Sequence, residues 1–457
     1  MAYLYDIDNE KILFDDGNNS FYLIPSKLAT EIEKLDEKDR EQVIEAVIAK
    51  KSSGCAVCAQ NKSEDDSDTC SRLVLVITQG CNLACKYCYA NEGLYNETCA
   101  KKMSFETAKN AIDTFLARYS GGIETIQFFG GEPLMNLPLI KSVCEHCEKL
   151  YSEGKTLKPI KFSISTNGTL INDETLELFN KYCMSVTVSL DGTKAVNDGQ
   201  RVFANSNEGT YNVIVDKLNM LKERKFPLAV EMTITQAFLD LDEEEQIQFV
   251  KTLNKMNIDS IHVVPVMSGE EYDRKITDSE AMCRFTDKVT DYTLSTVNSN
   301  EKIFLIKSLE IISLIEKKTK KNHFCNAGIT NFAVSAEGNL FPCFMLIDDN
   351  ETFCMGNVND TFDSERFEGI RNILKKCTYD SVKRCDSCFA KGICTNCIGN
   401  SFCVGHSETS FFIGYFPNKN GRGLWDGPSR VCRNQLLDAR MLLAVSKKVC
   451  AASAGVA

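Results

Sequence analysis

The stretch of sequence that decides the fold is Leu73–Tyr89, which reads LVLVITQGCNLACKYCY. It joins an apolar, strand-like segment, Leu73–Ile77, to a loop that carries Cys81, Cys85 and Cys88. Three closely spaced thiolates on one loop can hold three irons of a [4Fe–4S] cluster, because such clusters are ligated by cysteine sulfur. The fourth iron then has no protein ligand, and an open metal position is one that a substrate or cofactor can occupy.

A zinc knuckle, or three unrelated thiols, is the alternative for these cysteines. Zinc sites usually combine two separated pairs of cysteine or histidine into a closed set of four ligands. The nearest histidine along the chain is His146, far from the loop. The spacing therefore favours an iron–sulfur cluster over zinc.

The spacing also resembles the signature of radical S-adenosylmethionine (radical SAM) enzymes. In that signature three and then two residues separate three cysteines, and an aromatic residue, here Tyr87, precedes the last of them. The resemblance implies that the open iron binds S-adenosylmethionine (SAM). It further implies that SAM is cleaved to a 5′-deoxyadenosyl radical, which abstracts a hydrogen from the substrate.

Composition limits the partners and the compartment. The 457 residues suggest two to four domains, and 52 Lys+Arg against 63 Asp+Glu give a net charge of −11, which disfavours nucleic acid as a partner. No stretch of eighteen apolar residues predicts a membrane span, and the N-terminus lacks the basic start of a signal peptide. We therefore expect a cytoplasmic protein without membrane contact.

The chain carries 22 cysteines, which is many for a cytoplasmic protein. Disulfides are rare in that compartment, so clustered cysteines are interpreted as metal ligands. Cys55, Cys58 and Cys70 lie in or beside a polar stretch with no obvious fourth ligand, and we interpret them as free thiols. A labile third metal site is the alternative for these three.

The sequence pattern predicts an α/β fold in three parts: residues 1–70, 71–315 and 316–457. In the middle part, apolar strands alternate with helical segments, which is typical of a parallel sheet. The expected strands cover residues 73–77, 123–129, 160–165, 184–190, 228–234 and 260–266. This count is similar to the partial (β/α)6, TIM-like barrel of radical SAM enzymes, whose chemistry sits at the carboxyl ends of the strands.

The first part reads as three short strands, 3–5, 11–14 and 20–24, followed by two helical segments and a polar linker. Such a unit is expected to be winged-helix-like. It resembles the element with which peptide maturases recognise a precursor, where the leader of the peptide adds as a strand to a small sheet.

Glycine and polar residues follow the expected strands. Gly130, Gly131, Glu132 and Pro133 end the second strand and resemble the radical SAM motif that binds the methionine amino group of SAM. Asn167 follows the third strand as a further candidate contact. A plain turn is the alternative for the two glycines.

Three more positions complete the predicted SAM site. Ser189 and Asp191 would point the same way if the fourth strand continues, and could hold ribose hydroxyls, although either could be a turn former. Arg201 matches an arginine that pairs with the SAM carboxylate in radical SAM peptide maturases, and a surface arginine is the alternative. Val264 would back the adenine, and a buried core strand explains it equally well.

The C-terminal part is rich in cysteine and resembles the SPASM domain, which binds auxiliary [4Fe–4S] clusters. The matching residues are Cys325, Cys343, Cys385, Cys388, Cys394, Cys397 and Cys432. The resemblance implies that Cys325, Cys343 and Cys397 hold one auxiliary cluster and that the other four hold a second. Two residues rather than the usual three separate Cys394 from Cys397, so Cys403 could supply a ligand, or the first auxiliary cluster could keep an open iron. A zinc ribbon is the alternative.

SPASM proteins mostly act on ribosomal peptides. The resemblance therefore implies a maturase that forms thioether crosslinks in a precursor peptide, as sactipeptide and ranthipeptide enzymes do, with flavodoxin or ferredoxin as electron donor. A maturase forming carbon–carbon links is an open alternative. An anaerobic sulfatase maturase, which makes formylglycine, carries an acidic residue where this chain has Phe344. A non-enzymatic iron–sulfur electron carrier is a remote alternative, against which the SAM motifs count.

Overall fold

The computed structural model describes residues 2–52, 68–266, 279–296 and 319–381, with interruptions at 8–9, 16–19, 96 and 348–349, plus residue 276 and short runs between 303 and 317. Several predicted ligands or thiols lie outside the described residues. These are Cys55, Cys58, Cys385, Cys388, Cys394, Cys397, Cys403 and Cys432. Their roles stay predictions.

The N-terminal residues form a small unit with its own core. An antiparallel sheet in the order β1-β2-β3 is followed by two helices. Their bounds are β1 Ala2–Ile7, β2 Glu10–Asp15, β3 Ser20–Ile24, α1 Ser26–Glu33 and α2 Glu37–Ser52. Leu13, Ile24, Ile32 and Ile44 are buried together. The three predicted strands and two helices are confirmed, whereas the likeness to a winged helix stays a prediction.

A large and mostly parallel sheet organises the middle of the chain, with the strand order β11-β10-β9-β8-β7-β6-β4-β12-β13. Its strands are β4 Thr69–Gln79, β6 Gly122–Gly130, β7 Lys161–Thr166, β8 Ser185–Ser189, β9 Leu228–Ile234, β10 Ser260–Pro265, β11 Phe304–Leu305, β12 Asn331–Val334 and β13 Leu340–Phe341, with the short β5 Lys101–Lys102 beside β4. All six predicted strands are confirmed, and each pairs in parallel with the next. An α/β fold follows, while a TIM-like barrel stays a prediction.

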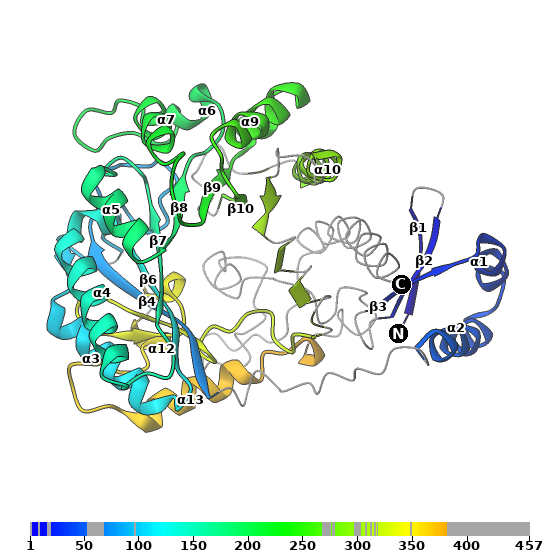
Figure 1. Cartoon of the computed structure of the whole chain (residues 1–457), viewed down its shortest axis with the longest axis horizontal. Helices are drawn as coiled ribbons and strands as arrows, with labels where there is room; N and C mark the ends of the chain where they lie inside the picture. The colour runs from blue at the N-terminus through cyan, green and yellow to red at the C-terminus, as the bar shows by residue number, and fades with distance from the viewer. Residues whose placement is uncertain are drawn as a thin grey trace.

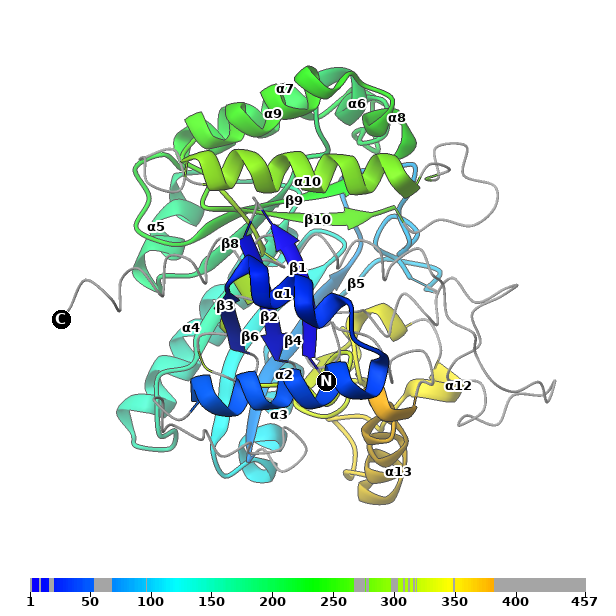
Figure 2. The same ribbon diagram turned by 90° about the vertical axis from the view of Figure 1, so that its right-hand side faces the viewer.

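Helices follow the strands in turn and lie on the outer side of the curved sheet (Figure 1). They are α3 Phe105–Arg118, α4 Leu137–Ser152, α5 Asp173–Lys181, α6 Lys194–Asp198, α7 Tyr211–Met220, α8 Gln236–Leu239, α9 Glu243–Lys255 and α10 Ser279–Thr296. Figure 2 shows α9 and α10 running beside each other above β9 and β10. Since the six strands β4, β6, β7, β8, β9 and β10 run parallel to one another, their carboxyl ends meet at one rim of the sheet.

Local sequence explains why these helices begin where they do. Ser104 accepts a hydrogen bond from the backbone N–H of Thr107, at 3.0 Å, and so caps α3. In α5, Asn172 and Thr175 form a reciprocal capping box. The buried residues of α3, among them Ala108 and Phe115, recur at helical spacing and pack onto the sheet.

The two faces of the sheet differ in side-chain type. Along β9, Val230, Met232 and Ile234 are buried under the helices, whereas Glu231 and Thr233 are half-buried on the opposite face. The same alternation runs along β6, β7, β8 and β10. Because successive side chains point to opposite faces, the helix-free face carries the half-buried residues.

Part of the predicted C-terminal domain is built into this sheet. β12 pairs in parallel with β4, and β13 pairs with β12. Phe332 of β12 packs against Phe115 of α3 with the rings tilted and their centroids 4.9 Å apart. Phe367 of α13 (Ser364–Lys375) belongs to the same core, and the short α12 (Asn350–Phe353) precedes it. The predicted boundary at residue 316 therefore separates segments that share one hydrophobic core.

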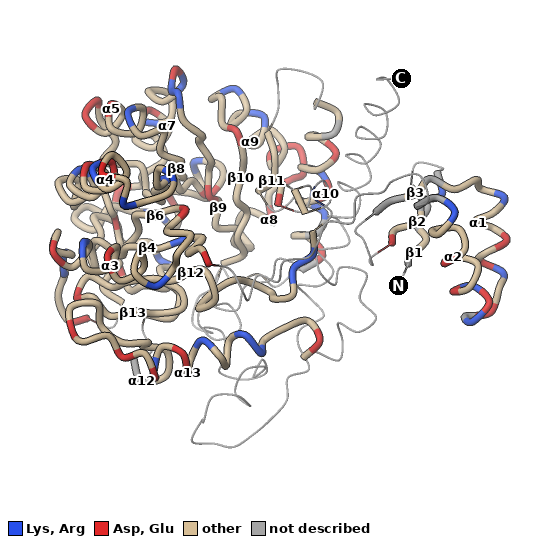
Figure 3. The backbone as a smooth tube through the Cα atoms, turned by 60° about the horizontal axis from the view of Figure 1, so that its bottom comes forward, with Lys and Arg blue, Asp and Glu red and all other residues tan. Residues whose placement is uncertain are grey.

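Acidic and basic residues are interspersed along the outer helices rather than gathered in one basic stripe (Figure 3). In the part of the chain that the structure describes, no helix has the length and apolar character needed to span a bilayer. Cytoplasmic location and the absence of nucleic acid as a partner stay predictions.

Candidate active site

The loop that follows β4 carries the three predicted cluster ligands. Cys81, Cys85 and Cys88 are all half-buried free thiols. The loop backbone is clamped by a segment more than a hundred positions away in sequence: the Ala84 and Lys86 N–H groups donate to the Val202 and Gln200 carbonyls, each at 2.9 Å. The cysteine loop is therefore held by long-range backbone hydrogen bonds and not only by its own turns.

Two glycines hold the other side of the loop. The Gly131 N–H donates to the Thr78 carbonyl, and the Glu132 N–H to the Gly80 carbonyl, each at 3.0 Å. A Cβ added to Gly131 would lie 2.2 Å from the Gly80 oxygen, and Gly130 has φ +143°. Only glycine fits both positions, because any side chain would overlap the backbone of the cysteine loop.

Glu132 acts within the protein. Its carboxylate is fully buried and accepts hydrogen bonds from the Leu134 N–H (2.9 Å), the Thr166 hydroxyl (2.7 Å) and the Asn167 N–H (2.7 Å). Burial raises its pKa, and these donors lower it in part. Glu132 thus ties the end of β6 to the end of β7, while the buried Pro133 begins the short 3-10 helix η2 (Pro133–Asn136).

Asn167 lies against the cysteine loop. Its side-chain amide donates to Asn82 Oδ1 at 2.9 Å and to Cys81 Sγ at 3.6 Å. Burial raises the pKa of Cys81 to about 12. The hydrogen bonds of Asn167 orient the loop that carries Cys81, and its predicted contact with SAM stays a prediction.

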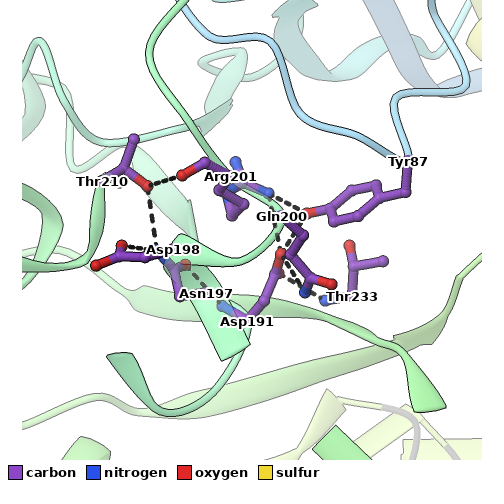
Figure 4. A network of polar contacts seen from close by, with 8 residues as sticks. All are labelled: Tyr87, Asp191, Asn197, Asp198, Gln200, Arg201, Thr210 and Thr233. Atoms are coloured by element: carbon purple, nitrogen blue, oxygen red, sulfur yellow. Dashed lines mark hydrogen bonds and ion pairs between the residues drawn. The ribbon is translucent and has the colours of Figure 1, made fainter. Parts of the chain in front are cut away.

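A buried polar network links the cysteine loop to β8 and β9 (Figure 4). The Tyr87 hydroxyl donates to Asp191, and Arg201 donates to the Tyr87 oxygen. Asp191 also accepts from Gln200 Nε2 at 3.2 Å and from the Thr233 N–H at 3.0 Å. Burial raises the pKa of Asp191, and the nearby Arg201 charge lowers it in part.

Asp191 is held inside this network. The fourth strand was expected to continue through Asp191, but β8 ends at Ser189. The Asp191 side chain is fully buried and engages Tyr87, Gln200 and the backbone of β9. Its predicted contact with ribose hydroxyls stays a prediction.

Arg201 is a buried side chain and not a surface arginine. Its Nη1 atom lies 3.7 Å from Asp191 Oδ2, and its Nε–H is buried with no hydrogen-bond partner. An unsatisfied buried donor is costly, so this N–H is available to a ligand. Burial raises the pKa of Cys85 to about 11, although the nearby Arg201 charge lowers it in part.

Ser189 and Val264 lie on the helix-free face. Ser189 is the last residue of β8, Val264 lies near the end of β10, and both are half-buried. Their predicted contacts with ribose and adenine stay predictions. Cys70, by contrast, is fully buried near the start of β4, and its interpretation as a free thiol stays a prediction.

The described C-terminal segment brings Cys343 toward this rim. Cys325 and Cys343 are half-buried cysteines outside any disulfide. Phe344, next to Cys343, packs on Phe129 of β6 with ring centroids 4.2 Å apart, and Phe129 directly precedes Gly130. Cys343, a predicted auxiliary ligand, is therefore adjacent to Phe344, which contacts the residue before Gly130 of the predicted SAM site.

One pair escaped the sequence analysis. Glu231 of β9 and His262 of β10 are opposite each other in the sheet register, and His262 Nδ1 lies 2.9 Å from Glu231 Oε2. The only sequence signal was that each is a titratable residue inside an otherwise apolar strand. Their partnership depends on strand register, which no motif revealed.

The donor set fits an iron–sulfur cluster with SAM beside it. Cysteine sulfur is the usual ligand of such clusters, and the loop offers three half-buried thiols. Close packing of Gly131 on the Gly80 backbone fixes the shape of the cysteine loop, and the buried Arg201 Nε–H has no acceptor among the described residues. Among the described residues, no three His, Cys, Asp or Glu side chains are grouped as around a single metal ion.

Comparison with known proteins agrees with this geometry. Residues 75–237 match the model of the radical SAM superfamily. The chain is 31% identical over 296 residues to an uncharacterized protein of Methanocaldococcus jannaschii, across 64% of this chain and 90% of that protein. It is 24% identical over 339 residues to the cysteine-type anaerobic sulfatase-maturating enzyme of Clostridium novyi, across 70% and 84% of the two chains.

Two solved structures share the fold. The anSMEcpe enzyme with bound AdoMet and Cp18Cys peptide superimposes with a TM-score of 0.65 at 17% identity, covering 83% of this chain and 99% of that one. Streptococcus suis SuiB bound to precursor peptide SuiA gives a TM-score of 0.53 at 16% identity, covering 88% and 95%. At these identities the likeness concerns the fold alone.

Proposed function

The chain belongs to the radical SAM superfamily, and from that premise we propose that it is a peptide maturase forming thioether crosslinks in a ribosomally made precursor. The observation that carries the proposal is the clamped loop of Cys81, Cys85 and Cys88, beside the free Nε–H of Arg201. Family membership implies a [4Fe–4S] cluster and SAM, which together supply a 5′-deoxyadenosyl radical.

The residues of this chain have distinct tasks in the proposal. Cys81, Cys85 and Cys88 hold the cluster, and the carbonyl groups around Gly130 and Gly131 accept from the SAM ammonium. The Arg201 Nε–H donates to the SAM carboxylate, because a guanidinium is a strong donor to carboxylates. Ser189 binds the ribose, and Val264 backs the adenine. Asn167 and Asp191 keep the loop and Arg201 in place.

Auxiliary clusters complete the proposed chemistry. A thioether forms when a substrate sulfur joins a carbon radical, and one electron must then leave. We assign this acceptor role to auxiliary [4Fe–4S] clusters held by Cys325, Cys343 and the cysteines beyond residue 381. Support comes from the contact between Phe344 and Phe129, which brings Cys343 close to the predicted SAM site.

The N-terminal unit is proposed to bind the leader of the precursor. Its three strands are ordered β1-β2-β3, so within the described residues β1 and β3 are both edge strands. An extended peptide can pair with such an edge through main-chain hydrogen bonds. SuiB, which shares the fold of this chain, was solved with a precursor peptide.

The most direct test uses a cysteine-bearing peptide encoded beside the gene, incubated with enzyme, SAM and a reductant. A thioether maturase removes two hydrogens per link and leaves the sulfur in the peptide, which mass spectrometry with thiol alkylation detects. Retention of all free thiols while SAM is consumed would contradict the proposal. In a second arm, deletion of residues 1–50 is expected to weaken peptide binding more than peptide-independent SAM cleavage.

Formylglycine formation is the second candidate, because the Clostridium novyi relative is a sulfatase-maturating enzyme. That reaction removes sulfur from the cysteine, so the same mass measurement separates the two products. Sulfatase maturases carry an acidic residue at the position of Phe344. In this chain the Phe344 ring packs on Phe129. An aromatic side chain there cannot take a proton, which favours the thioether proposal.

A further inference from the structure

A histidine–carboxylate pair lies on the helix-free face of the sheet, outside the network of Figure 4. His262 and Glu231 are cross-strand partners with Nδ1 and Oε2 2.9 Å apart. Their side chains are 36% and 34% exposed, so both are accessible to a ligand while packed against their strands. A carboxylate on one ring nitrogen orients a histidine and leaves the other nitrogen for proton transfer.

The position of the pair follows from strand alternation. Ile261 and Val263, on either side of His262, are buried in the core beneath the helices. His262 therefore projects from the opposite face. Glu231 is also paired in register with Ser189, the last residue of β8. Ser189, Glu231 and His262 thus form one row across three adjacent strands, which Figure 1 shows side by side.

This row is close to the cysteine loop. Tyr87 of that loop donates to Asp191, and Asp191 accepts from the backbone N–H of Thr233. Thr233 lies two residues beyond Glu231 on the same strand face, a step of about 7 Å at the usual rise of a strand. The Glu231–His262 pair is therefore next, along the same face of β9, to the network of Tyr87 and Asp191 that contacts the predicted cluster loop.

Among the described residues, Glu231 is the only titratable partner that faces His262 from the neighbouring strands. From β8, the helix-free face offers Thr187 and Ser189, which do not ionise near neutral pH. On the other side of β10, β11 consists of Phe304 and Leu305. Within the described part of β8 to β11, His262 is thus the one imidazole of this row, and Glu231 is the one carboxylate beside it.

We propose that His262 accepts the proton of the substrate thiol and that Glu231 positions its imidazole. The inference rests on the proposed function. The substrate S–H bond breaks, its proton moves to the imidazole, and the sulfur keeps the electron pair. The thiolate then bonds to the carbon from which the 5′-deoxyadenosyl radical took a hydrogen atom. The remaining electron passes to an oxidised iron–sulfur cluster, so atoms and electrons balance.

The test separates hydrogen abstraction from proton removal. Holoenzyme is given SAM and a cysteine peptide deuterated at the carbon that reacts, and both deuterium in 5′-deoxyadenosine and crosslinked peptide are measured. His262→Ala should still transfer deuterium but form crosslinks about a hundredfold more slowly near neutral pH, within the range of general base catalysis. Added imidazole, or a pH near the ordinary thiol pKa of about 8.5, should restore the product.

Two further variants make the test specific. Glu231→Gln should lower crosslinking less than His262→Ala, with the same response to pH. Lys161→Ala is the matched control, since it removes another cross-strand ion pair, Lys161–Glu124 at 3.2 Å, from the amino end of β7. The control should leave both readouts unchanged.

A measurement without SAM tests the inference apart from turnover. The rate at which a bound peptide thiol is alkylated on the holoenzyme reports its ionisation at each pH. Wild type should show a midpoint below about 8.5, and His262→Ala a midpoint near that value. Equal midpoints, or equal crosslinking by His262→Ala and wild type, would overturn the inference. Absence of deuterium transfer in wild type would instead overturn the proposed function.

Discussion

The two halves of the sheet contribute different kinds of contacts to the rim that carries the candidate site. In the half made of β4, β6 and β7, backbone atoms and glycines make the site: Gly131 and Glu132 bond to the backbone of the cysteine loop. In the half made of β8, β9 and β10, side chains make it, through Asp191, Arg201 and the Glu231–His262 pair.

This difference has a physical consequence. A Cβ added to Gly131 would lie 2.2 Å from the Gly80 oxygen, so no side chain fits at this position. The backbone of the first half is therefore fixed in shape. A side-chain network can be altered one group at a time, and each group can serve a ligand. We therefore expect substitutions in the first half to abolish the site and those in the second half to change affinity or rate.

The largest effect is expected for Cys85→Ala, which removes one of three predicted cluster ligands from the rigid half. Peptide modification and SAM cleavage should both fall to background, because the cluster loses a thiolate. The measurement is 5′-deoxyadenosine and product mass in the same assay, with iron content determined. Cys183→Ala, at an exposed thiol, is the control and should behave as wild type. Product formation by Cys85→Ala would mean that this loop does not generate the radical.

Gly131→Ala comes next. Its methyl group would lie 2.2 Å from the Gly80 oxygen, so the cysteine loop must shift. Overlap of this kind costs about 1–3 kcal/mol, and we expect lower cluster content with a large loss of SAM cleavage. Gly369→Ala is the control, since nothing lies within 4 Å of the added carbon in α13, and it should stabilise the protein by roughly 0.5–1 kcal/mol. Normal cluster content in Gly131→Ala would argue against a rigid cradle.

A smaller effect is expected for Arg201→Lys in the second half. Lysine has no equivalent of the buried Nε–H, so SAM affinity should fall by roughly thirtyfold, the equivalent of about 2 kcal/mol. Calorimetry of SAM binding measures this. Arg224→Lys makes the same change at a 3% exposed arginine bonded to Asp259, and should lower thermal stability without altering SAM affinity. An unchanged SAM affinity in Arg201→Lys would mean that Arg201 contacts only other residues of the protein and not SAM.

The smallest effect is expected for Ser189→Ala. Loss of one neutral hydrogen bond to the ribose should weaken SAM binding about threefold to tenfold, with no change in melting temperature. Ser185→Ala, at the exposed start of the same strand face, should change neither quantity. If Ser189→Ala binds SAM as wild type does, the ribose contact lies elsewhere on the rim.

The sequence was sufficient for the six central parallel strands and for the glycine turn that follows β6. All six strands were predicted because apolar runs alternate with helical segments. The motif Gly130–Pro133 could be recognised because its four residues are consecutive in the sequence. The buried contacts of Asp191 with Tyr87 and Gln200 could not be predicted, because they depend on where β8 ends and on which loops pack against it. The shared core of Phe115 and Phe332 was also missed, since it joins residues on either side of the predicted boundary at 316.

What the sequence determined by itself was chemistry held in short segments: three thiols within eight residues and a Gly-Gly turn after a strand. What only the tertiary structure decided was which distant side chains meet. Arg201 reaches Tyr87 because backbone hydrogen bonds from Ala84 and Lys86 join the two loops. His262 faces Glu231 because parallel strands in fixed register align residues that the intervening helix separates along the chain. Neither pair is visible until the chain is folded, since each depends on which segments lie side by side.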